Sequence, residues 1–285
     1  MPGRRRLDAE LVRRKIARSR EQAVTMIRGG RVEVGGMVAT KPATVVNPDA
    51  SIRVSEDAND TWASRGAHKL LGALDAFAPM GLSLEGQTVL DAGASTGGFT
   101  DVALRRGAKE VVAVDVGYGQ LVWRLQNDPR VTVMDRTNIR HLTPQLVAQA
   151  RGAADSEHKA GLCTAMVGDL SFISLRLTLP PILDCLTEGA HLLPMVKPQF
   201  EVGKERLGSG GVVRDPALRA EVTAEIAEFA QGLGTSLRSV VASPLPGPSG
   251  NVEYFLWLVK DGGATACTTA RIREMVATAV KEGPQ

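Results

Sequence analysis

The chain has 285 residues and a net charge of +3; 44% of its residues are hydrophobic, 23% are charged and 4% are aromatic. This composition is ordinary for a folded protein and excludes a fibrous or largely disordered chain. The positively charged N-terminus is not followed by an apolar segment, and no stretch approaches the roughly 18 apolar residues that a membrane-spanning helix needs. We therefore expect a cytoplasmic protein that makes no membrane contact.

The cysteines and histidines do not suggest a metal site. Cys163, Cys185 and Cys267 are far apart and lack C-x-x-C spacing, so neither a disulfide framework nor a zinc site is predicted. The four histidines also lack the spacing of metal ligands. We expect reduced, mostly buried thiols and no requirement for a metal.

Charge is unevenly distributed along the chain. Residues 1–54 hold 12 Lys and Arg against 5 Asp and Glu, so they carry +7 while the rest of the chain carries −4. A basic module joined to a mildly acidic body suggests that the first part binds a polyanion. A solvated basic face is the alternative.

The first 57 residues are predicted to form a small α+β domain. Apolar residues at helical spacing predict a helix near residues 7–17, and Ser19 is placed to cap a second helix that ends at a glycine pair. Residues 31–54 are rich in β-forming residues around the Gly35-Gly36 turn, which predicts a hairpin.

The segment RLDAELVRRKIARSREQAVTMIRGGRVEVGG resembles the RNA-binding domain first described in ribosomal protein S-four. This resemblance implies contacts from basic residues to an RNA backbone, which position the RNA without reading its sequence. The implied residues are Arg18, Arg20 and Arg28, together with Arg4, Arg5 and Arg6. Lys41 and Arg65 are further basic residues that we expect to contact RNA.

Residues 58–64 are predicted to be a linker and residues 65–285 a second domain. Trp62 departs from the polarity of this linker, so it either docks the two modules together or contacts a ligand or RNA. Beyond it, helical patterns alternate with short apolar strands, as in a parallel sheet covered on both faces. We predict a doubly wound, Rossmann-like α/β domain with seven strands, of which the last is antiparallel, and a surface insertion at residues 151–161.

The segment VLDAGASTGGFTD, residues 89–101, places a glycine-rich loop between a strand and a helix. It lacks the lysine of a phosphate loop, and Ser95 stands where a dinucleotide loop has a glycine. Asp91 would also repel a phosphate. A ligand with a positively charged amino acid end and a ribose, but no phosphate, fits these residues, which predicts S-adenosylmethionine (SAM).

Acidic residues after the next strands complete the predicted cofactor site. Asp115 follows Asp91 by 24 residues and is placed to bind the ribose hydroxyls, and the segment 135–138 is placed near the adenine. The predicted cofactor-binding residues are Asp91, Gly93, Ala94, Ser95, Thr96, Gly97, Gly98, Phe99, Asp115, Val116, Asp135, Asn138 and Asp169.

The segment GDLSFIS, residues 168–174, lies where the methyl acceptor is expected. It lacks the [N/D]-P-P-[F/Y] pattern of enzymes that methylate an amine, and no cysteine is placed to attack a base carbon. Oxygen is left as the acceptor atom. A ribose hydroxyl is a poor nucleophile, so its proton must be taken or shared during transfer.

Four charged residues are expected at the same carboxyl edge of the sheet: Lys69, Asp169, Lys197 and Glu253. Each alone has an ordinary structural explanation, but in chain order they match the catalytic tetrad of the FtsJ-type ribose 2′-O-methyltransferases. The motifs SRGAHKL, LDAGASTGGFTD, VDVGYGQL, DLSFISL, VKPQFEVGK and SPLPGPSGNVEYF resemble the TlyA family, whose members are known both as haemolysins and as rRNA 2′-O-methyltransferases.

The resemblance runs from about Arg6 to Lys260 and implies a methyl transfer to a cytidine 2′-OH in 16S rRNA. For members with this longer N-terminal region it also implies 23S rRNA, so assembled 30S and 50S subunits are the expected partners. A small-molecule O-methyltransferase is the alternative. A membrane-active haemolysin is a further one, but we see no secretion signal or membrane helix.

For the mechanism, we expect Lys197 to accept or orient the proton of the 2′-OH and Lys69 to stabilise developing oxyanion charge. Asp169 and Glu253 would fix the two lysines. Phe172 either stacks on a flipped target base or is a buried residue at a strand end. The glycine-rich segment 201–215, with Lys204 and Arg206, is either an RNA-contacting loop or an ordinary one.

Overall fold

The computed structural model describes residues 4–17, 19–28, 30–54, 62–152, 162–203, 205–247 and 249–284, with only the backbone of Thr25 and Ser209. The chain divides into two compact units, Met1–Thr61 and Trp62–Gln285. The second unit thus begins three residues before the predicted position 65. Most of the predicted linker lies outside the described residues.

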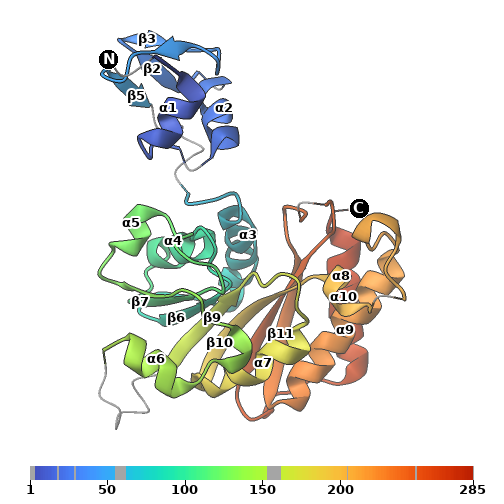
Figure 1. Cartoon of the computed structure of the whole chain (residues 1–285). Helices are drawn as coiled ribbons and strands as arrows, with labels where there is room; N and C mark the ends of the chain where they lie inside the picture. Colours follow the sequence, from blue (N-terminus) through green and yellow to red (C-terminus); the bar gives the residue numbers. More distant parts are fainter. Residues whose placement is uncertain are drawn as a thin grey trace. The chain divides into compact units, whose positions relative to one another are not determined.

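The N-terminal unit packs two helices against short antiparallel strands (Figure 1). Its elements are β1 (Arg5–Arg6), α1 (Leu7–Arg13), α2 (Arg20–Arg28), β2 (Val32–Val34), β3 (Met37–Val38), β4 (Val45–Val46) and β5 (Ile52–Val54). Leu7, Leu11 and Ile27 are wholly buried in its core. The Oγ of Ser19 accepts a hydrogen bond from Gln22 N at 3.1 Å, so the predicted cap of α2 is present.

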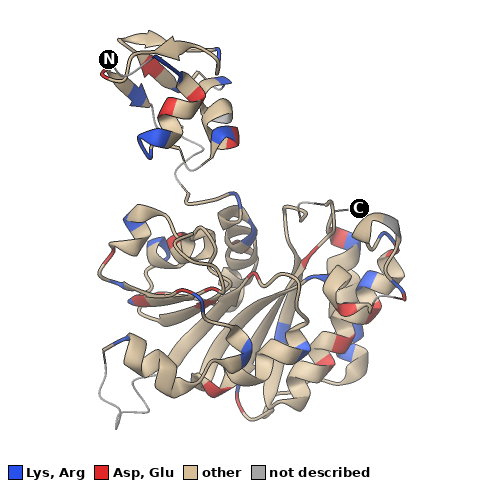
Figure 2. Cartoon of the chain, in the orientation of Figure 1, with Lys and Arg blue, Asp and Glu red and all other residues tan. Residues whose placement is uncertain are grey.

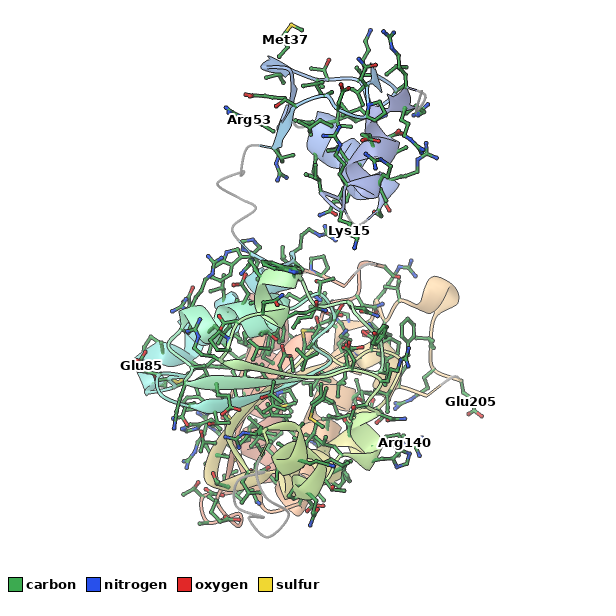
Figure 3. All side chains as sticks on the ribbon, turned by 60° about the vertical axis from the view of Figure 1, so that its left-hand side comes forward. Lys15, Met37, Arg53, Glu85, Arg140 and Glu205 are labelled. Atoms are coloured by element: carbon green, nitrogen blue, oxygen red, sulfur yellow. The ribbon has the colours of Figure 1, made fainter. Side chains whose placement is uncertain are left out.

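Some basic residues of this unit are held by structural contacts. Glu10 is wholly buried and accepts hydrogen bonds from Arg13 and Arg14, which lower the pKa of its carboxyl to about 2. Arg14 also donates to the carbonyl oxygens of Pro48 and Ala50 at 2.7 and 2.8 Å. Arg14 therefore links α1 to the turn after β4. Figure 3 shows that Arg53, in contrast, projects from the unit's surface.

The second unit is a seven-stranded sheet with helices on both faces (Figure 1). Its elements are α3 (Ala67–Phe77), η1 (Ala78–Met80), β6 (Thr88–Ala92), α4 (Gly98–Arg105), β7 (Glu110–Val114), α5 (Trp123–Gln126), β8 (Val131–Met134), η2 (Ile139–His141), α6 (Pro144–Ala150), β9 (Cys163–Gly168), α7 (Leu175–Asp184), β10 (Leu186–Val196), α8 (Pro198–Glu201), η4 (Ser209–Gly211), α9 (Pro216–Gly232), β11 (Thr235–Ala242), β12 (Tyr254–Lys260) and α10 (Thr269–Glu282).

The strand order is β11-β12-β10-β9-β6-β7-β8. Strands β8, β7, β6, β9 and β10 are parallel, and β12 runs antiparallel to both of its neighbours. The predicted doubly wound sheet with an antiparallel last strand is confirmed. Helix α10 follows β12 and packs beside α9 and β11.

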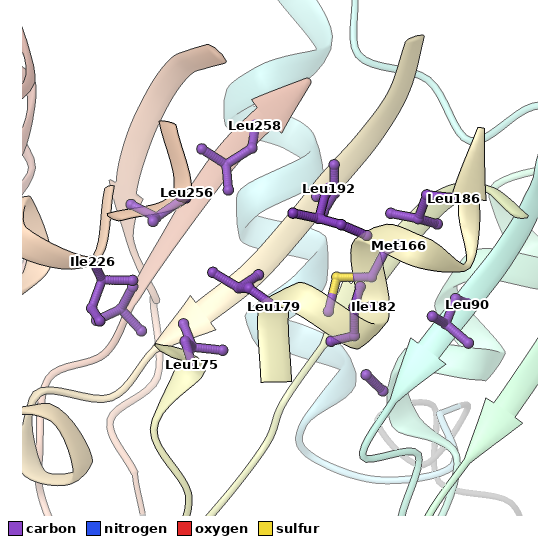
Figure 4. Packing of buried hydrophobic residues seen from close by; sticks show 14 of the residues in the cluster. Leu90, Met166, Leu175, Leu179, Ile182, Leu186, Leu192, Ile226, Leu256 and Leu258 are labelled. Atoms are coloured by element: carbon purple, nitrogen blue, oxygen red, sulfur yellow. The ribbon is translucent and has the colours of Figure 1, made fainter. Parts of the chain in front are cut away.

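Two hydrophobic cores lie on opposite faces of this sheet, because successive residues of a strand point to opposite sides. Val89 packs in the core beneath α3 and α4, whereas its neighbour Leu90 packs with Met166 and Leu256 in the core beneath α7 and α9. Figure 4 shows the second of these cores. Burial on both faces explains why the strands are apolar along their whole length.

The parallel register brings the carboxyl ends of the strands to one edge. Ala92 pairs with Val114 on one side and with Gly168 on the other, and Gly168 pairs with Pro194. The residues that follow each strand therefore lie along the same edge of the sheet, as is usual for ligand sites in such folds.

Two further predictions concern thiols and membrane spans. Cys163, Cys185 and Cys267 are free; the first two are buried, and burial raises the pKa of each of these two thiols to about 12. Among the helices that the structure describes, none is long and apolar enough to cross a membrane.

Candidate active site

Three adjoining pockets follow the carboxyl edge of the sheet. The glycine-loop pocket, of about 590 Å³, is lined by residues 64–66, 69, 93–96, 98, 99, 169, 245–247 and 250. The Asp115 pocket, of about 490 Å³, is lined by residues 93, 95, 114–116, 120, 137–139 and 169–173. The Lys197 pocket, of about 360 Å³, is lined by residues 171, 172, 197, 199, 200, 207, 210, 211, 247, 249, 251 and 253. Asp169, Phe172 and Gly247 each line two of them.

The glycine-rich loop between β6 and α4 is fixed by β7. The backbone N–H groups of Gly93 and Ala94 both donate to Val114 O, and Ser95 N donates to Asp115 Oδ2 at 2.8 Å. Gly93 and Ser95 have φ values of 85° and 47°. Left-handed backbone at two positions turns the chain sharply, so that the loop lines the pocket with main chain.

Asp115 lies between the loop and the Asp115 pocket. Its Oδ1 accepts a hydrogen bond from Gly117 N at 2.7 Å, and with Val116 and Asn138 it lines the pocket. Asp135 is predicted to bind the cofactor, but its surroundings in the structure do not match this role. Its Oδ2 accepts from Gly119 N at 2.8 Å, and it lines none of the three pockets. Asp135 therefore supports the loop after β7.

Asp91 also lies behind the site. It is wholly buried, lines none of the three pockets, and its Oδ2 accepts a hydrogen bond from Thr100 Oγ1 at 2.6 Å. Burial raises the pKa of its carboxyl to about 7, although the bond from Thr100 opposes this; the nearby Asp169 and Asp115 raise it further. Asp91 is thus placed to support the glycine loop from beneath.

Replacing Asp91 by asparagine should remove a pH dependence of stability. The carboxyl of the unfolded chain loses its proton near pH 3.8, whereas the folded protein keeps that proton to about pH 7. The contribution of Asp91 to wild-type stability should therefore fall as the pH rises from about 4 to 7. Relative to wild type, Asp91→Asn should gain about 2–3 kcal/mol in free energy of unfolding between about pH 5 and pH 7. Denaturant titrations of both proteins check this, and an identical pH dependence would contradict it.

The four charged residues that the sequence predicts to converge do so. Lys69 Nζ donates to Glu253 Oε2 at 2.5 Å and lies 3.9 Å from Asp169 Oδ2. Lys197 Nζ lies 2.6 Å from Asp169 Oδ1 and 3.9 Å from Glu253 Oε1. Each lysine thus contacts both carboxylates, and the cluster has no net charge.

Burial makes this cluster electrostatically strong. Glu253 and Lys197 are 1% and 6% exposed, and Lys69 is 8% exposed. Low-dielectric surroundings strengthen attraction between opposite charges and make an unpaired charge costly. Lys197 Nζ also donates to Ser171 Oγ at 2.7 Å, a partner that the sequence analysis missed although it precedes Phe172 in the same motif.

Phe172 is 91% exposed, so the expectation of a buried residue at a strand end is wrong. Its φ of 62° is unusual for a bulky residue, and such strained backbone is concentrated at functional sites. The ring lies 5.2 Å, between centroids, from the ring of Phe200, which the sequence analysis also missed. An exposed aromatic ring therefore stands at the mouth of the Lys197 pocket.

Trp62 packs within the second unit. The guanidinium of Arg105 lies 4.4 Å from the centre of the Trp62 ring, and Ala63 N donates to the buried carboxylate of Asp101 at 2.8 Å. The residues that follow, 64–66, line the glycine-loop pocket. Of these, the sequence predicts a role only for Arg65, as an RNA contact.

The predicted RNA-binding residues are mostly exposed. Figure 2 shows where Lys and Arg, and Asp and Glu, lie along the chain. Arg5, Arg28 and Lys41 are exposed, Arg4 donates to Asn47, Arg6 pairs with Asp8, and Arg20 lies 3.6 Å from Asp8. Arg206 pairs with Glu221 at 2.6 Å and donates to Val202 O. Arg18 and Lys204 lie outside the described residues. No group of three potential metal ligands is found in the described part of the chain.

Comparison with known families decides the class of this site. The profile of FtsJ-like methyltransferases matches residues 62–260, which include the whole tetrad, and that of the S4 domain matches residues 5–52. The chain belongs to the FtsJ-like methyltransferase family. It is therefore a methyltransferase with an N-terminal S4 domain.

Relatives within the family extend over the whole chain. The 16S/23S rRNA (cytidine-2′-O)-methyltransferase TlyA of Mycobacterium tuberculosis is 51% identical, covering 100% of both chains. The 23S rRNA (cytidine-2′-O)-methyltransferase TlyA of Campylobacter jejuni is 28% identical over 88% of this chain and 98% of its own. A solved structure of a protein named as a hemolysin, from Streptococcus thermophilus, has 36% identity and a TM-score of 0.70, covering 98% of this chain and 96% of its own. The resemblance to the TlyA family is confirmed.

Proposed function

We propose that this protein transfers the methyl group of SAM to the 2′-OH of a cytidine in ribosomal RNA. The main support for this proposal is a buried cluster that borders both the glycine-loop pocket and the Lys197 pocket. The cluster consists of Lys69, Asp169, Lys197 and Glu253. The rRNA substrate is supported by the S4 domain and by the names of the relatives. We further propose that 16S and 23S rRNA, within assembled 30S and 50S subunits in the cytoplasm, are both substrates.

The residues around the first two pockets suit SAM. The glycine loop offers main chain to the methionine end, and Asp115 offers a carboxylate on the side of the ribose, with Val116 and Asn138 beyond it. SAM has no phosphate, so it needs no lysine or arginine beside it. When bound, it supplies an electrophilic methyl group. Asp91 and Asp135 act indirectly, through the loops that they hold.

The tetrad supplies the proton chemistry. Lys197 lines the Lys197 pocket; as an uncharged amine it accepts the proton of the 2′-OH, and as an ammonium it orients that hydroxyl, while Asp169 and Glu253 hold it in position. Lys69 adds a second cation that stabilises charge developing on the ribose oxygen. Phe172, exposed at the same pocket, is placed to stack on the base of the acceptor nucleotide. The exposed basic residues of the S4 domain would bind the RNA backbone.

The test uses labelled SAM with naked 16S and 23S rRNA, with 30S and 50S subunits, and with Lys197→Ala as the inactive control. We expect label in ribose of subunit rRNA that disappears with the control, and rRNA binding that weakens steeply with salt, as several phosphate contacts require. Retained SAM binding without transfer to any RNA would contradict the proposal. It would favour a small-molecule acceptor.

A further inference from the structure

The Lys197 pocket contains a buried polar atom, Gln199 Oε1, to which the proposed chemistry gives no role. Gln199, the second residue of α8, lines this pocket, and its Oε1 is buried yet accepts no hydrogen bond from any residue that the structure describes. Buried polar atoms are nearly always hydrogen-bonded, so an acceptor left over in a binding pocket points to a donor on the ligand.

The other carboxamide of this pocket is already committed. Asn251 donates from Nδ2 to Gly211 O at 2.9 Å and accepts at Oδ1 from Val213 N at 2.9 Å. It is 3% exposed and fixes the wall of the pocket. Lys197 is likewise held by Asp169 and Ser171. Gln199 is therefore the side-chain amide available to read the edge of a bound base.

The aromatic side chains beside Gln199 suit a base at this position. Phe200 follows Gln199 directly, and its ring is 5.2 Å from that of the exposed Phe172. A base stacked on Phe172 would present its hydrogen-bonding edge to the pocket that Gln199 lines. This argument rests on the proposed function, because it assumes that the acceptor is a nucleotide of rRNA.

The two pyrimidines differ at one exocyclic group. Cytosine carries an amine that donates, whereas uracil carries a carbonyl oxygen that accepts at the same position. We propose that Gln199 Oε1 accepts a hydrogen bond from the exocyclic amine of the acceptor base and thereby selects cytidine over uridine. With the amide oriented as in the structure, uridine would leave two oxygens facing each other, each without a donor.

The measurement is the ratio of kcat/KM for cytidine over uridine, using subunits that carry either base at the acceptor position mapped with wild-type enzyme. Gln199→Met keeps the length of the side chain but has no amide, so the ratio should fall by about tenfold or more. Gln199→Glu keeps an acceptor and loses the donor, so its ratio should stay near that of wild type. Because each ratio compares two substrates of the same variant, a general loss of activity cancels.

Gln149→Met serves as the matched control, because Gln149 is an exposed residue of α6 outside all three pockets. SAM binding by calorimetry verifies that each variant is folded. If Gln199→Met leaves the ratio of kcat/KM for cytidine over uridine unchanged, the inference is overturned. It is also overturned if Gln199→Glu lowers this ratio, because the amide N–H would then be the group that selects the base. In either case wild-type labelling is intact, whereas a wild type that labels neither subunit overturns the proposed function itself.

Discussion

Lys197→Ala should lower kcat by about 10²- to 10⁴-fold, the range that a positioned proton acceptor contributes. Lys197 Nζ lies 2.6 Å from Asp169 Oδ1 and donates to Ser171 Oγ, so alanine removes the amine at the centre of the proposed chemistry. The glycine loop is fixed by β7, so SAM affinity should change little. Single-turnover rates with subunit rRNA and calorimetry with SAM give the two quantities separately.

Lys197→Arg separates proton transfer from charge. Arginine retains the positive charge but does not release a proton at any accessible pH. If Lys197 accepts the proton of the 2′-OH, the arginine variant should be nearly as inactive as the alanine variant. A fully active Lys197→Arg enzyme would contradict the role as a base and leave orientation of the hydroxyl as its function. Lys109→Ala, at an exposed position of the same unit, controls for loss of a surface cation.

The same substitution also affects stability, which has to be measured beside the rate. In the alanine variant, Lys69 is the one cation of the cluster that remains for Asp169 and for the almost fully buried Glu253. Breaking a buried ion pair costs about 3–5 kcal/mol when the remaining charge stays buried, and less here because the Asp169 side chain is 23% exposed. Rates should therefore be compared well below the melting temperature of each variant.

The positions of Asp169 and Lys197 could be predicted from the sequence alone. Each follows an apolar run that is long enough for one buried strand, and parallel strands end at a common edge. Lys69 and Glu253 are expected at the same edge, but the rule for parallel strands does not by itself fix their positions. Lys69 lies on α3, and Glu253 directly precedes the antiparallel β12, so their places depend on packing between distant segments. The resemblance to a family with a known tetrad supplied that information.

Residue type alone did not show which carboxylates face the pockets. Asp91, Asp115 and Asp135 all stand near strand ends, but only Asp115 lines a pocket. The direction of each side chain depends on local partners, Thr100 for Asp91 and the backbone of Gly119 for Asp135. The pairing of β1 with β4 was missed for a simpler reason, because strands of two residues have no periodic pattern to detect.

Gly97→Ala should weaken SAM binding by about tenfold or more. A methyl group built on Gly97 would come within 2.4 Å of Leu125 Cδ1 and 2.8 Å of Leu121 Cδ1. Both leucines are buried among other side chains, so we expect relief to shift the start of α5 as well as the leucine side chains. Because Val122 N donates to Thr96 O at 3.2 Å, such a movement would carry the glycine loop with it.

Gly81→Ala is a closely matched control for this substitution. Gly81 and Gly97 both have a φ of 97°, so alanine is strained to a similar degree at either position, at a cost of about 1–2 kcal/mol. Around Gly81, however, no atom of the described residues other than its chain neighbours lies within 4 Å of the added methyl group. The difference between the two variants therefore measures crowding beneath the loop, which should add about 1–3 kcal/mol of destabilisation at Gly97.

Calorimetry with SAM and thermal unfolding of both variants test whether crowding beneath the loop weakens SAM binding. If the leucines beneath Gly97 fix the loop in its binding conformation, Gly81→Ala should lose stability while keeping wild-type SAM affinity, and Gly97→Ala should lose both. Equal SAM affinities in the two variants would show that the loop tolerates the added methyl group. The packing of α5 would then have no part in cofactor binding, and the shape of the site would depend on β7 and Asp115 instead.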